Sequence, residues 1–404
     1  MTKDPRCRSG RWTGYCNASC VSIGFNEHPG IAMSKQTHSR RDFLVRAAKA
    51  AALGVSGTTA LSGVSAFATP IAQPIATSTA DGLIPYGAAA RSDALVSDLP
   101  YRDAILANCQ MIVPESELKW AELRPTRGEF RFEKADAIVD FGRQNGIKVR
   151  GHTLAWYGAM PEWTEQIADR AEAERELTGH IETVVSRYRG QIPSWDVINE
   201  PLAEWPDNES SFRPSIWARL LGPDYLSIAL RETALADPDV QLVLNDYDVE
   251  YKGPRFAARR KALIALLRSL RDRGVPLHAV GLQAHLFAGR TIDRDGLQAL
   301  VAEIKALELD VLITELDVID YELPGKVGER DAMVAAMAAQ FLGAVGEVMR
   351  PKAILTWGLS DRYTWVPTYF KRRDGMPNRP LPLDANLNRK PLYDVIEEFR
   401  HKPA

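Results

Sequence analysis

The sequence predicts an α/β protein built as a single (β/α)8 barrel of the TIM-barrel type over residues 83–404. From residue 83 onward, short apolar runs alternate with longer helical patterns, and there are eight such runs. Each run is almost continuously apolar, as parallel strands buried on both faces should be. Eight strands that are each followed by a helix favour a closed barrel over an open sheet. The predicted strands are 83–89, 110–113, 148–154, 194–199, 241–245, 279–283, 311–315 and 353–357.

The helical patterns support the barrel, and the motifs and composition argue against two classes of ligand. Residues 256–273 and 330–349 carry apolar side chains at three- and four-residue spacing and are the clearest predicted helices. No glycine-rich phosphate loop follows a predicted strand, which gives little support to nucleotide binding. The 404-residue chain is 25% charged with a formal net charge of −2, so we expect no nucleic-acid partner.

The N-terminal part of the chain resembles an export signal. Residues 39–44 read S-R-R-D-F-L, similar to the twin-arginine signal of bacterial export. A mildly apolar Ala/Gly-rich run, 47–60, follows, and small residues on either side of Phe67 predict cleavage after Ala68. The apolar run is too short and too mild to be a stable membrane anchor. We therefore expect export to the periplasm or to the outside of the cell.

The predicted division of the chain follows from this signal. We expect residues 1–32 to be a non-native or disordered extension, residues 33–68 the signal peptide with Met33 as the true start, and residues 69–82 a linker.

The cysteines do not predict a metal site. Three of the four lie within the first 20 residues, and their spacing fits no zinc motif. Cys109 is expected to be a buried small apolar residue. We expect no metal, no cofactor and a monomeric protein.

Polar and aromatic residues gather where the predicted strands end. In a barrel, the C-terminal ends of the strands form one face, and that face carries the active site. A single Asn or Glu in such a place is more often a helix cap, but six strand ends that deliver such groups to one rim indicate a site. The groups are His152, Asn199 with Glu200, Asn245 with Asp246, Gln283 with His285, Glu315, and Trp357.

Glu200 and Glu315 have the arrangement that glycosidic bond cleavage requires. That reaction needs a proton donor for the leaving oxygen and a second carboxylate that faces the anomeric carbon. Each glutamate ends an apolar run, where partial burial disfavours the charged form. Their strands are expected to lie across the barrel mouth from each other, so that the carboxylates converge to roughly 5–5.5 Å, the separation of a retaining enzyme.

Neighbouring residues are expected to support these two carboxylates. Asn199 can donate to a sugar 2-hydroxyl, a contact that tightens in an oxocarbenium-like transition state. His285 can hydrogen-bond Glu315 and hold its orientation and charge, and Asp317 can orient His285 in turn. Flat sugar faces stack on aromatic rings, and the rings that flank the strand ends are Trp156, Trp163, Trp357, Tyr363 and Trp365.

Several motifs, in order along residues 85–400, resemble glycoside hydrolase family 10. The acid/base motif of that family is similar to W-D-V-I-N-E (195–200), and its nucleophile motif is similar to I-T-E-L-D (313–317). Further similar segments are G-H-T-L-A-W (151–156), L-N-D-Y (244–247), G-L-Q-A-H (281–285), W-G-L-S-D-R-Y-T-W (357–365) and P-L-D-A-N-L-N-R-K-P-L-Y (382–393).

The resemblance implies a (β/α)8 endo-1,4-β-xylanase that hydrolyses xylan or xylo-oligosaccharides with retention and without a metal. Glu200 would be the general acid/base and Glu315 the nucleophile. Glu115 and Lys119 would bind the next sugar toward the non-reducing end. The subsite of the reacting sugar would be shaped by Asn199, His152, Gln283, His285, Trp357 and Trp365.

Two positions depart from the family pattern. Ser116 stands where the family usually has Asn, and Tyr157 stands where it often has His. Neither change touches the carboxylates, but both put the finer substrate preference in doubt. Two alternatives stay open: a β-glucanase or other β-glycosidase of the same family, and a non-catalytic periplasmic sugar-binding barrel, against which the presence of both glutamates argues.

Overall fold

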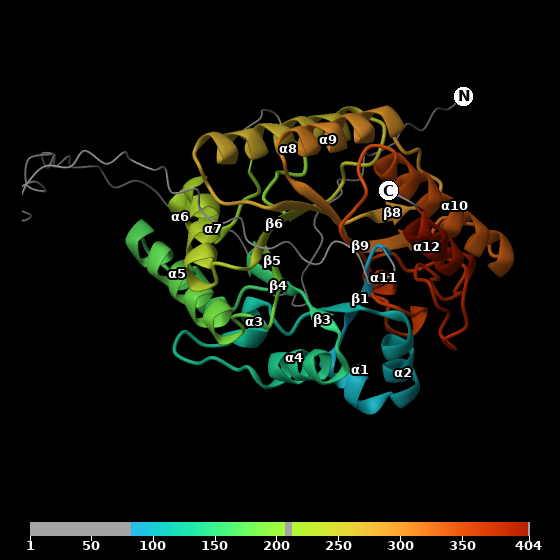
Figure 1. Ribbon diagram of the computed structural model, residues 1–404, viewed down its shortest axis with the longest axis horizontal. Helices are drawn as coiled ribbons and strands as arrows, with labels where there is room; N and C mark the ends of the chain where they lie inside the picture. Colours follow the sequence, from blue (N-terminus) through green and yellow to red (C-terminus); the bar gives the residue numbers. More distant parts are fainter. Residues whose placement is uncertain (1–81, 207–211, 403–404) are drawn as a thin grey trace, which may run out of the picture. The chain divides into compact units, whose positions relative to one another are not determined.

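The computed structural model describes residues 82–206 and 212–402. Within them lie ten parallel strands (Figure 1). Nine follow the order β3-β2-β1-β10-β9-β7-β6-β5-β4, and the tenth, β8, pairs with β9. β3 continues into β4 after Arg150, and β7 continues into β8 after two residues. The ten strands therefore amount to eight, and the step from β3 to β4 closes the ring. The predicted single (β/α)8 barrel is confirmed.

The strands and helices alternate along most of the chain, and the helices surround the ring of strands (Figure 1). The strands are β1 (Tyr86–Ala90), β2 (Met111–Pro114), β3 (Lys148–Val149), β4 (Gly151–Ala155), β5 (Ser194–Asn199), β6 (Gln241–Asp246), β7 (Ala279–Leu282), β8 (His285–Phe287), β9 (Asp310–Ile319) and β10 (Ile354–Thr356). The helices are α1 (Ser92–Ser97), α2 (Leu99–Asn108), α3 (Trp120–Leu123), α4 (Glu133–Asn145), α5 (Arg170–Arg187), α6 (Ile216–Leu221), α7 (Asp224–Ala236), α8 (Pro254–Asp272), α9 (Arg294–Ala306), α10 (Val327–Gly346), α11 (Val366–Tyr369) and α12 (Pro391–His401).

All eight predicted strands correspond to observed ones, with ends that shift by a few residues. The clearest difference is β9, which runs past Glu315 to Ile319 and pairs with β8. This extension places Asp317 opposite His285 in the register. It was not predicted because charged residues at 315 and 317 interrupt the apolar run.

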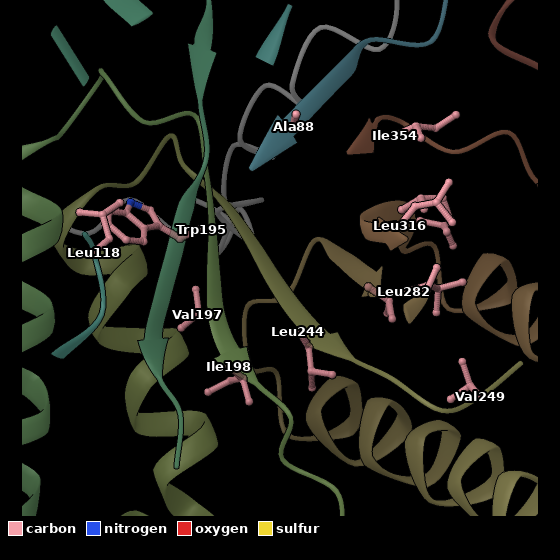
Figure 2. Packing of buried hydrophobic residues seen from close by; sticks show 14 of the residues in the cluster. Ala88, Leu118, Trp195, Val197, Ile198, Leu244, Val249, Leu282, Leu316 and Ile354 are labelled. Atoms are coloured by element: carbon pink, nitrogen blue, oxygen red, sulfur yellow. The ribbon is translucent and has the colours of Figure 1, made fainter. Parts of the chain in front are cut away.

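Successive side chains of each strand point alternately into and out of the barrel, so the core has two layers. Residues that point into the barrel form a small cluster, which includes Val243, Leu312 and Leu355. Their strand neighbours point outward into a large layer between strands and helices, where Trp195, Leu244 and Leu282 lie (Figure 2). Cys109 is buried in this outer layer, as predicted.

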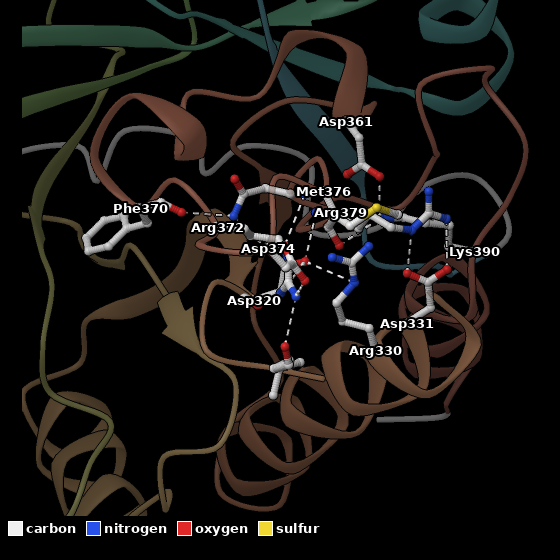
Figure 3. Close-up of polar contacts among 12 residues, drawn as sticks. Asp320, Arg330, Asp331, Asp361, Phe370, Arg372, Asp374, Met376, Arg379 and Lys390 are labelled. Carbon is white, nitrogen blue, oxygen red and sulfur yellow. Dashed lines mark hydrogen bonds and ion pairs between the residues drawn. The ribbon is translucent and has the colours of Figure 1, made fainter. Parts of the chain in front are cut away.

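Buried and half-buried ion pairs fix the segment 361–390, which carries Trp365 and ends before α12 (Figure 3). Arg379 donates two hydrogen bonds of 2.8 Å to Asp331 in α10. Lys390 donates to Asp361 at 2.7 Å, and both side chains are buried. Removing one partner of a buried pair leaves an uncompensated charge, so these contacts make the position of the segment well defined.

The predicted extension, signal peptide and most of the linker, with Cys7, Cys16 and Cys20, lie outside the described residues. Among the residues described, no helix has the length and apolar character needed to cross a bilayer.

Candidate active site

The strand ends open into one pocket that contains both predicted carboxylates. Glu200 follows the last residue of β5, and Glu315 lies in β9. The pocket is lined by Lys119, His152, Trp156, Asn199, Glu200, Tyr247, Asp248, Gln283, His285, Glu315, Trp357 and Trp365. Ten of these twelve residues were predicted from the sequence as site residues.

Six of the predicted residues do not line the pocket. Trp163 donates to the backbone oxygen of Arg124, Tyr363 donates to Asp98, and Asp246 accepts from Arg259. Asn245 and Asp317 lie directly behind the pocket and hydrogen-bond residues that line it. Glu115 is placed on the loop after β2, where burial raises its pKa more than the charges of Lys119 and Arg91 lower it. A sugar-binding role for Glu115 stays a prediction.

A short chain of amide groups joins the two carboxylates. Asn245 Nδ2 donates to Glu315 Oε1 at 2.7 Å and to Asn199 Oδ1 at 2.9 Å. Gln283 Nε2 donates to the same Asn199 oxygen and to Glu200 Oε1, both at 3.2 Å. The oxygen of Asn199 is thus the shared acceptor, and the two glutamates are fixed relative to each other from β5, β6, β7 and β9.

Two glycines make room for this arrangement. A Cβ on Gly281 would lie 2.2 Å from Asn245 Oδ1, so only glycine lets that amide sit between the strands. A Cβ on Gly151 would lie 2.0 Å from the Trp195 ring, which packs against β4.

Glu315 is surrounded by groups that favour its charged form. His285 Nε2 lies 3.2 Å from Glu315 Oε2, and His285 Nδ1 lies 2.9 Å from Asp317 Oδ1. Burial alone would raise the pKa of Glu315. The hydrogen bond from His285 and the charges of His152 and His285 outweigh burial, so the pKa lies below its usual range. Burial acts on Glu315 in the expected direction, and the predicted contact with His285 holds its charge, as expected, because the net effect lowers the pKa.

His285 is held as an imidazolium between two carboxylates. Burial lowers its pKa, but the charge and hydrogen bond of Asp317, with those of Glu315, raise it well above the ordinary value. Both ring nitrogens then donate. Trp365 Nε1 completes the line by donating to the other oxygen of Asp317 at 2.7 Å.

Glu200 has a different environment. Its Oε1 accepts hydrogen bonds from Asn199 and Gln283, at 3.1 and 3.2 Å. Its Oε2 is buried and has no hydrogen-bond partner among residues 82–206 and 212–402. The backbone of Glu200 has a φ of 52°, in the left-handed region, where a side chain other than glycine is strained. One oxygen is thereby fixed and the other is available to a ligand in the pocket.

His152 is positioned by a buried ion pair beneath the pocket. Arg150 Nη2 donates to Asp196 Oδ1 at 2.6 Å, and His152 Nδ1 donates to Asp196 Oδ2 at 3.0 Å. Burial raises the pKa of Asp196, but the charge of Arg150 and the hydrogen bond from His152 lower it by more. The net pKa lies below its usual value, so Asp196 is ionised. The other nitrogen of His152 is left for the pocket.

Aromatic rings and one cation form the other wall. Lys119 Nζ lies 5.0 Å from the centre of the Trp156 ring and 5.6 Å from that of Trp357. The rings of His152 and Trp357 meet edge to face at 5.2 Å. Rings and a lysine together are well suited to a sugar, which has both apolar faces and hydroxyl groups.

Sequence reasoning missed Tyr247 and Asp248, which line the pocket beyond the end of β6. Tyr247 hydrogen-bonds Arg213, and its pKa is raised by burial and then by the charge of Glu200. Tyr247 belongs to the L-N-D-Y segment, so the motif held a signal for it. Arg213 comes from a distant loop and also covers the ring of Tyr157, 4.5 Å from its centre.

No group of three or more His, Cys, Asp or Glu side chains in the described part of the chain could hold a metal ion.

Comparisons with known proteins agree with this geometry. The family model of glycosyl hydrolase family 10 matches residues 75–399. The chain is 32% identical over 325 residues to endo-1,4-beta-xylanase 1 of Humicola insolens, covering 78% of this chain and 71% of the relative. It is 32% identical over 300 residues to endo-1,4-beta-xylanase B of Thermotoga neapolitana, covering 74% and 83%. The crystal structure of xylanase 10B from Thermotoga petrophila RKU-1 in complex with xylobiose is similar with a TM-score of 0.71 and 31% identity, covering 78% of this chain and 93% of that one. Because the family model matches most of the sequence, this chain belongs to glycosyl hydrolase family 10.

Proposed function

We propose that the protein is an endo-1,4-β-xylanase that cuts xylan by double displacement with retention. The observation that carries the proposal is the asymmetric pair of carboxylates in one pocket. Glu315 is held ionised by His285, while Glu200 keeps one oxygen without a partner in the described part of the chain. Membership of the family and the named activities of the two relatives support xylan as the substrate.

In the first step, Glu315 attacks the anomeric carbon as the bond to the leaving oxygen breaks. Glu200 gives its proton to that oxygen from Oε2, and a glycosyl ester forms on Glu315. In the second step, Glu200, now a carboxylate, takes a proton from water as the water attacks the same carbon. The ester breaks, and both glutamates return to their starting states.

The amide chain assists by holding the reacting groups in place. Asn245 stabilises the charge on Glu315 before attack, and the second N–H of Asn199 is available to a sugar hydroxyl. Because these donors are fixed by the barrel strands, little reorganisation is needed as charge moves.

Glu200→Gln and Glu315→Gln test the assignment of the two roles. Both variants keep the volume of the side chain. Glu315→Gln should lose hydrolysis of every substrate. Glu200→Gln should lower kcat/KM about 10²–10⁴-fold on xylan. On an aryl xylobioside whose leaving group needs no proton, kcat/KM should fall much less, while kcat still falls because the second step lacks its base. Near-wild-type activity on xylan in either variant would reject the proposal.

The choice of xylan over β-glucan is tested with matched substrates. A glucose unit adds a hydroxymethyl group at C5, which needs space beside Trp357 and Trp365. We expect an aryl xylobioside to be hydrolysed with a kcat/KM at least tenfold above that of the aryl cellobioside, since one misfitting group costs about that much. Equal values would favour the broader β-glycosidase function.

Export remains part of the proposal. The order of the twin arginines, the apolar run and the small residues before Ala68 supports it. Expression in a bacterium with and without a functional twin-arginine pathway, followed by N-terminal sequencing, tests it. We expect a mature protein that begins at residue 69 only where the pathway works.

A further inference from the structure

A second hollow opens beside the active site and shares Asp248 with it. Its volume is about 730 Å³, and it is formed by loops that follow β5, β6 and β8 together with the end of α11. Its walls are mainly rings, contributed by Trp205, Tyr251, Phe256, Phe287, Tyr369 and Phe370. We call this space the aromatic hollow.

The position of the aromatic hollow follows from the barrel. In the closed ring of strands, β7 lies diametrically opposite β2. The loop after β2 carries Glu115 and Lys119, so the aromatic hollow lies across the pocket from them. A polysaccharide that passes over Glu200 and Glu315 would continue into it, with flat rings on which its sugars or branches can stack.

The charges in the aromatic hollow are unevenly matched. Its two acids are paired: Asp248 with Arg255, and Glu204 with Arg213 at 3.5 Å. Two exposed cations also line it, Lys252 and Arg290. Within residues 82–206 and 212–402, no carboxylate comes within ion-pair distance of either one.

Arg290 is held in a defined place. Its guanidinium carbon lies 3.9 Å from the centre of the Phe287 ring and 5.4 Å from that of Tyr251. Phe287 in turn meets Phe370 edge to face at 5.1 Å, and its backbone N–H donates to the Tyr251 hydroxyl at 2.6 Å. A guanidinium that lies on a ring keeps the N–H groups of its edge free, and these match a carboxylate in a two-point bond.

We propose that the aromatic hollow binds a uronic-acid branch of xylan, with the branch carboxylate on Arg290 and Lys252 adding long-range attraction. The inference rests on the proposed xylanase function and deepens it, because it names an acidic, branched xylan as the preferred substrate. The exposed rings of Trp205 and Tyr369 hold the apolar faces of the sugars, and Arg290 distinguishes an acidic branch from a neutral one.

The test compares two substrates that differ only in the charge of the branch. Glucuronoxylan is used as isolated and after chemical reduction of its carboxyl groups, which leaves a neutral branch of nearly the same size. Wild type should hydrolyse the acidic form with a kcat/KM about tenfold higher, the effect of one charge-assisted hydrogen-bonded pair. The preference should shrink at 0.5 M salt.

Variants of Arg290 assign the preference to this side chain. Arg290→Gln should bring the two forms of the substrate to the same kcat/KM, while linear xylohexaose is hydrolysed as by wild type. Arg290→Lys should keep part of the preference. The matched control is Arg389→Gln, because Arg389 is also exposed and lies over a ring, 4.2 Å from the centre of Tyr393 at the start of α12. This control should leave the preference intact.

The outcomes separate the two proposals. If wild type cuts linear xylohexaose but treats acidic and reduced glucuronoxylan alike, the inference is overturned and the xylanase proposal stands. The same holds if Arg290→Gln keeps the full preference. If wild type cuts neither xylohexaose nor xylan, the proposed function is wrong and the inference fails with it.

Discussion

The indole N–H of Trp365 donates to Asp317 at 2.7 Å, and through Asp317 it is connected to the nucleophile. Asp317 accepts from His285 with its other oxygen, and His285 donates to Glu315. A ring positioned to contact the sugar thus belongs to the same hydrogen-bonded line that sets the charge of Glu315. This row of hydrogen bonds, and the contacts that hold its residues in place, lead to four predictions.

Replacement of His285 by Ala should move the acidic limb of the kcat/KM profile to higher pH. In the wild type, the bond and charge of His285 hold the pKa of Glu315 below its usual value against burial. Without them burial prevails, the pKa rises, and Glu315 is protonated at a pH where the wild type is still active. The measurement is kcat/KM between about pH 3 and 9. An unchanged acidic limb with only a lower plateau would mean that His285 has a structural role alone.

The wild type should also lose stability on the alkaline side because of His285. Its folded-state pKa is well above its ordinary value of 6.5. A group with a raised folded pKa contributes stability that is fully present below the unfolded pKa and is lost as pH rises through the folded one. Urea unfolding of wild type and His285→Ala should therefore differ most near pH 6 and converge in alkaline solution. A difference that grows with pH would contradict the assignment.

Gly281→Ala should reduce activity through Asn245 rather than through global unfolding. The new Cβ would lie 2.2 Å from Asn245 Oδ1, so the amide must move away from Glu315 and Asn199. We expect about a 10²-fold loss in kcat, the usual result of misplacing reacting groups by about 1 Å. Gly179→Ala in α5 is the control, since nothing lies within 4 Å of its new Cβ. It should leave kcat unchanged and stabilise the helix by about 0.5–1 kcal/mol.

Lys390→Met should destabilise the protein, and more so at pH 7.5 than at pH 5. The variant leaves Asp361 buried without its partner, which costs about 3–5 kcal/mol when the carboxylate is charged. Burial already raises the pKa of Asp361 to about 6 despite Lys390, and loss of the lysine raises it further. At pH 5 the carboxyl is protonated, so the cost falls. Urea unfolding at the two pH values measures this, and an equal loss at both would show that Asp361 does not titrate as described.

The barrel and most of the pocket could be predicted from the sequence because the signals are local. Parallel strands such as β5 appear as apolar runs, and the residue at the end of each run falls on the catalytic face. Asn199, Glu200 and Gln283 were found in this way. The same reasoning predicted the contacts of His285 with Glu315 and Asp317, but not the amide contacts of Asn245 and Gln283 that join the two glutamates.

What could not be predicted depends on residues far apart in the sequence. Burial of Glu315 and its contact with His285 were both expected from the sequence. Which of their opposite effects on the pKa of Glu315 prevails depends on the register of β8 with β9, which the sequence does not show. Tyr247 and Asp248 follow the end of β6, and Asp248 has a φ of 57°, a turn that strand patterns do not reveal. The aromatic hollow is assembled from three separate loops and the end of α11, none of which is unusual alone.

The most direct test of the central claim is to trap the covalent intermediate. A 2-fluoro xylobioside with a good leaving group should form the ester but hydrolyse it slowly. Mass spectrometry of the digested protein should then find the sugar on Glu315, and proton NMR of the first product from xylo-oligosaccharides should show the β-anomer. A label on another residue, or an α-anomer formed first, would contradict the assignment of Glu315 as nucleophile and Glu200 as acid/base.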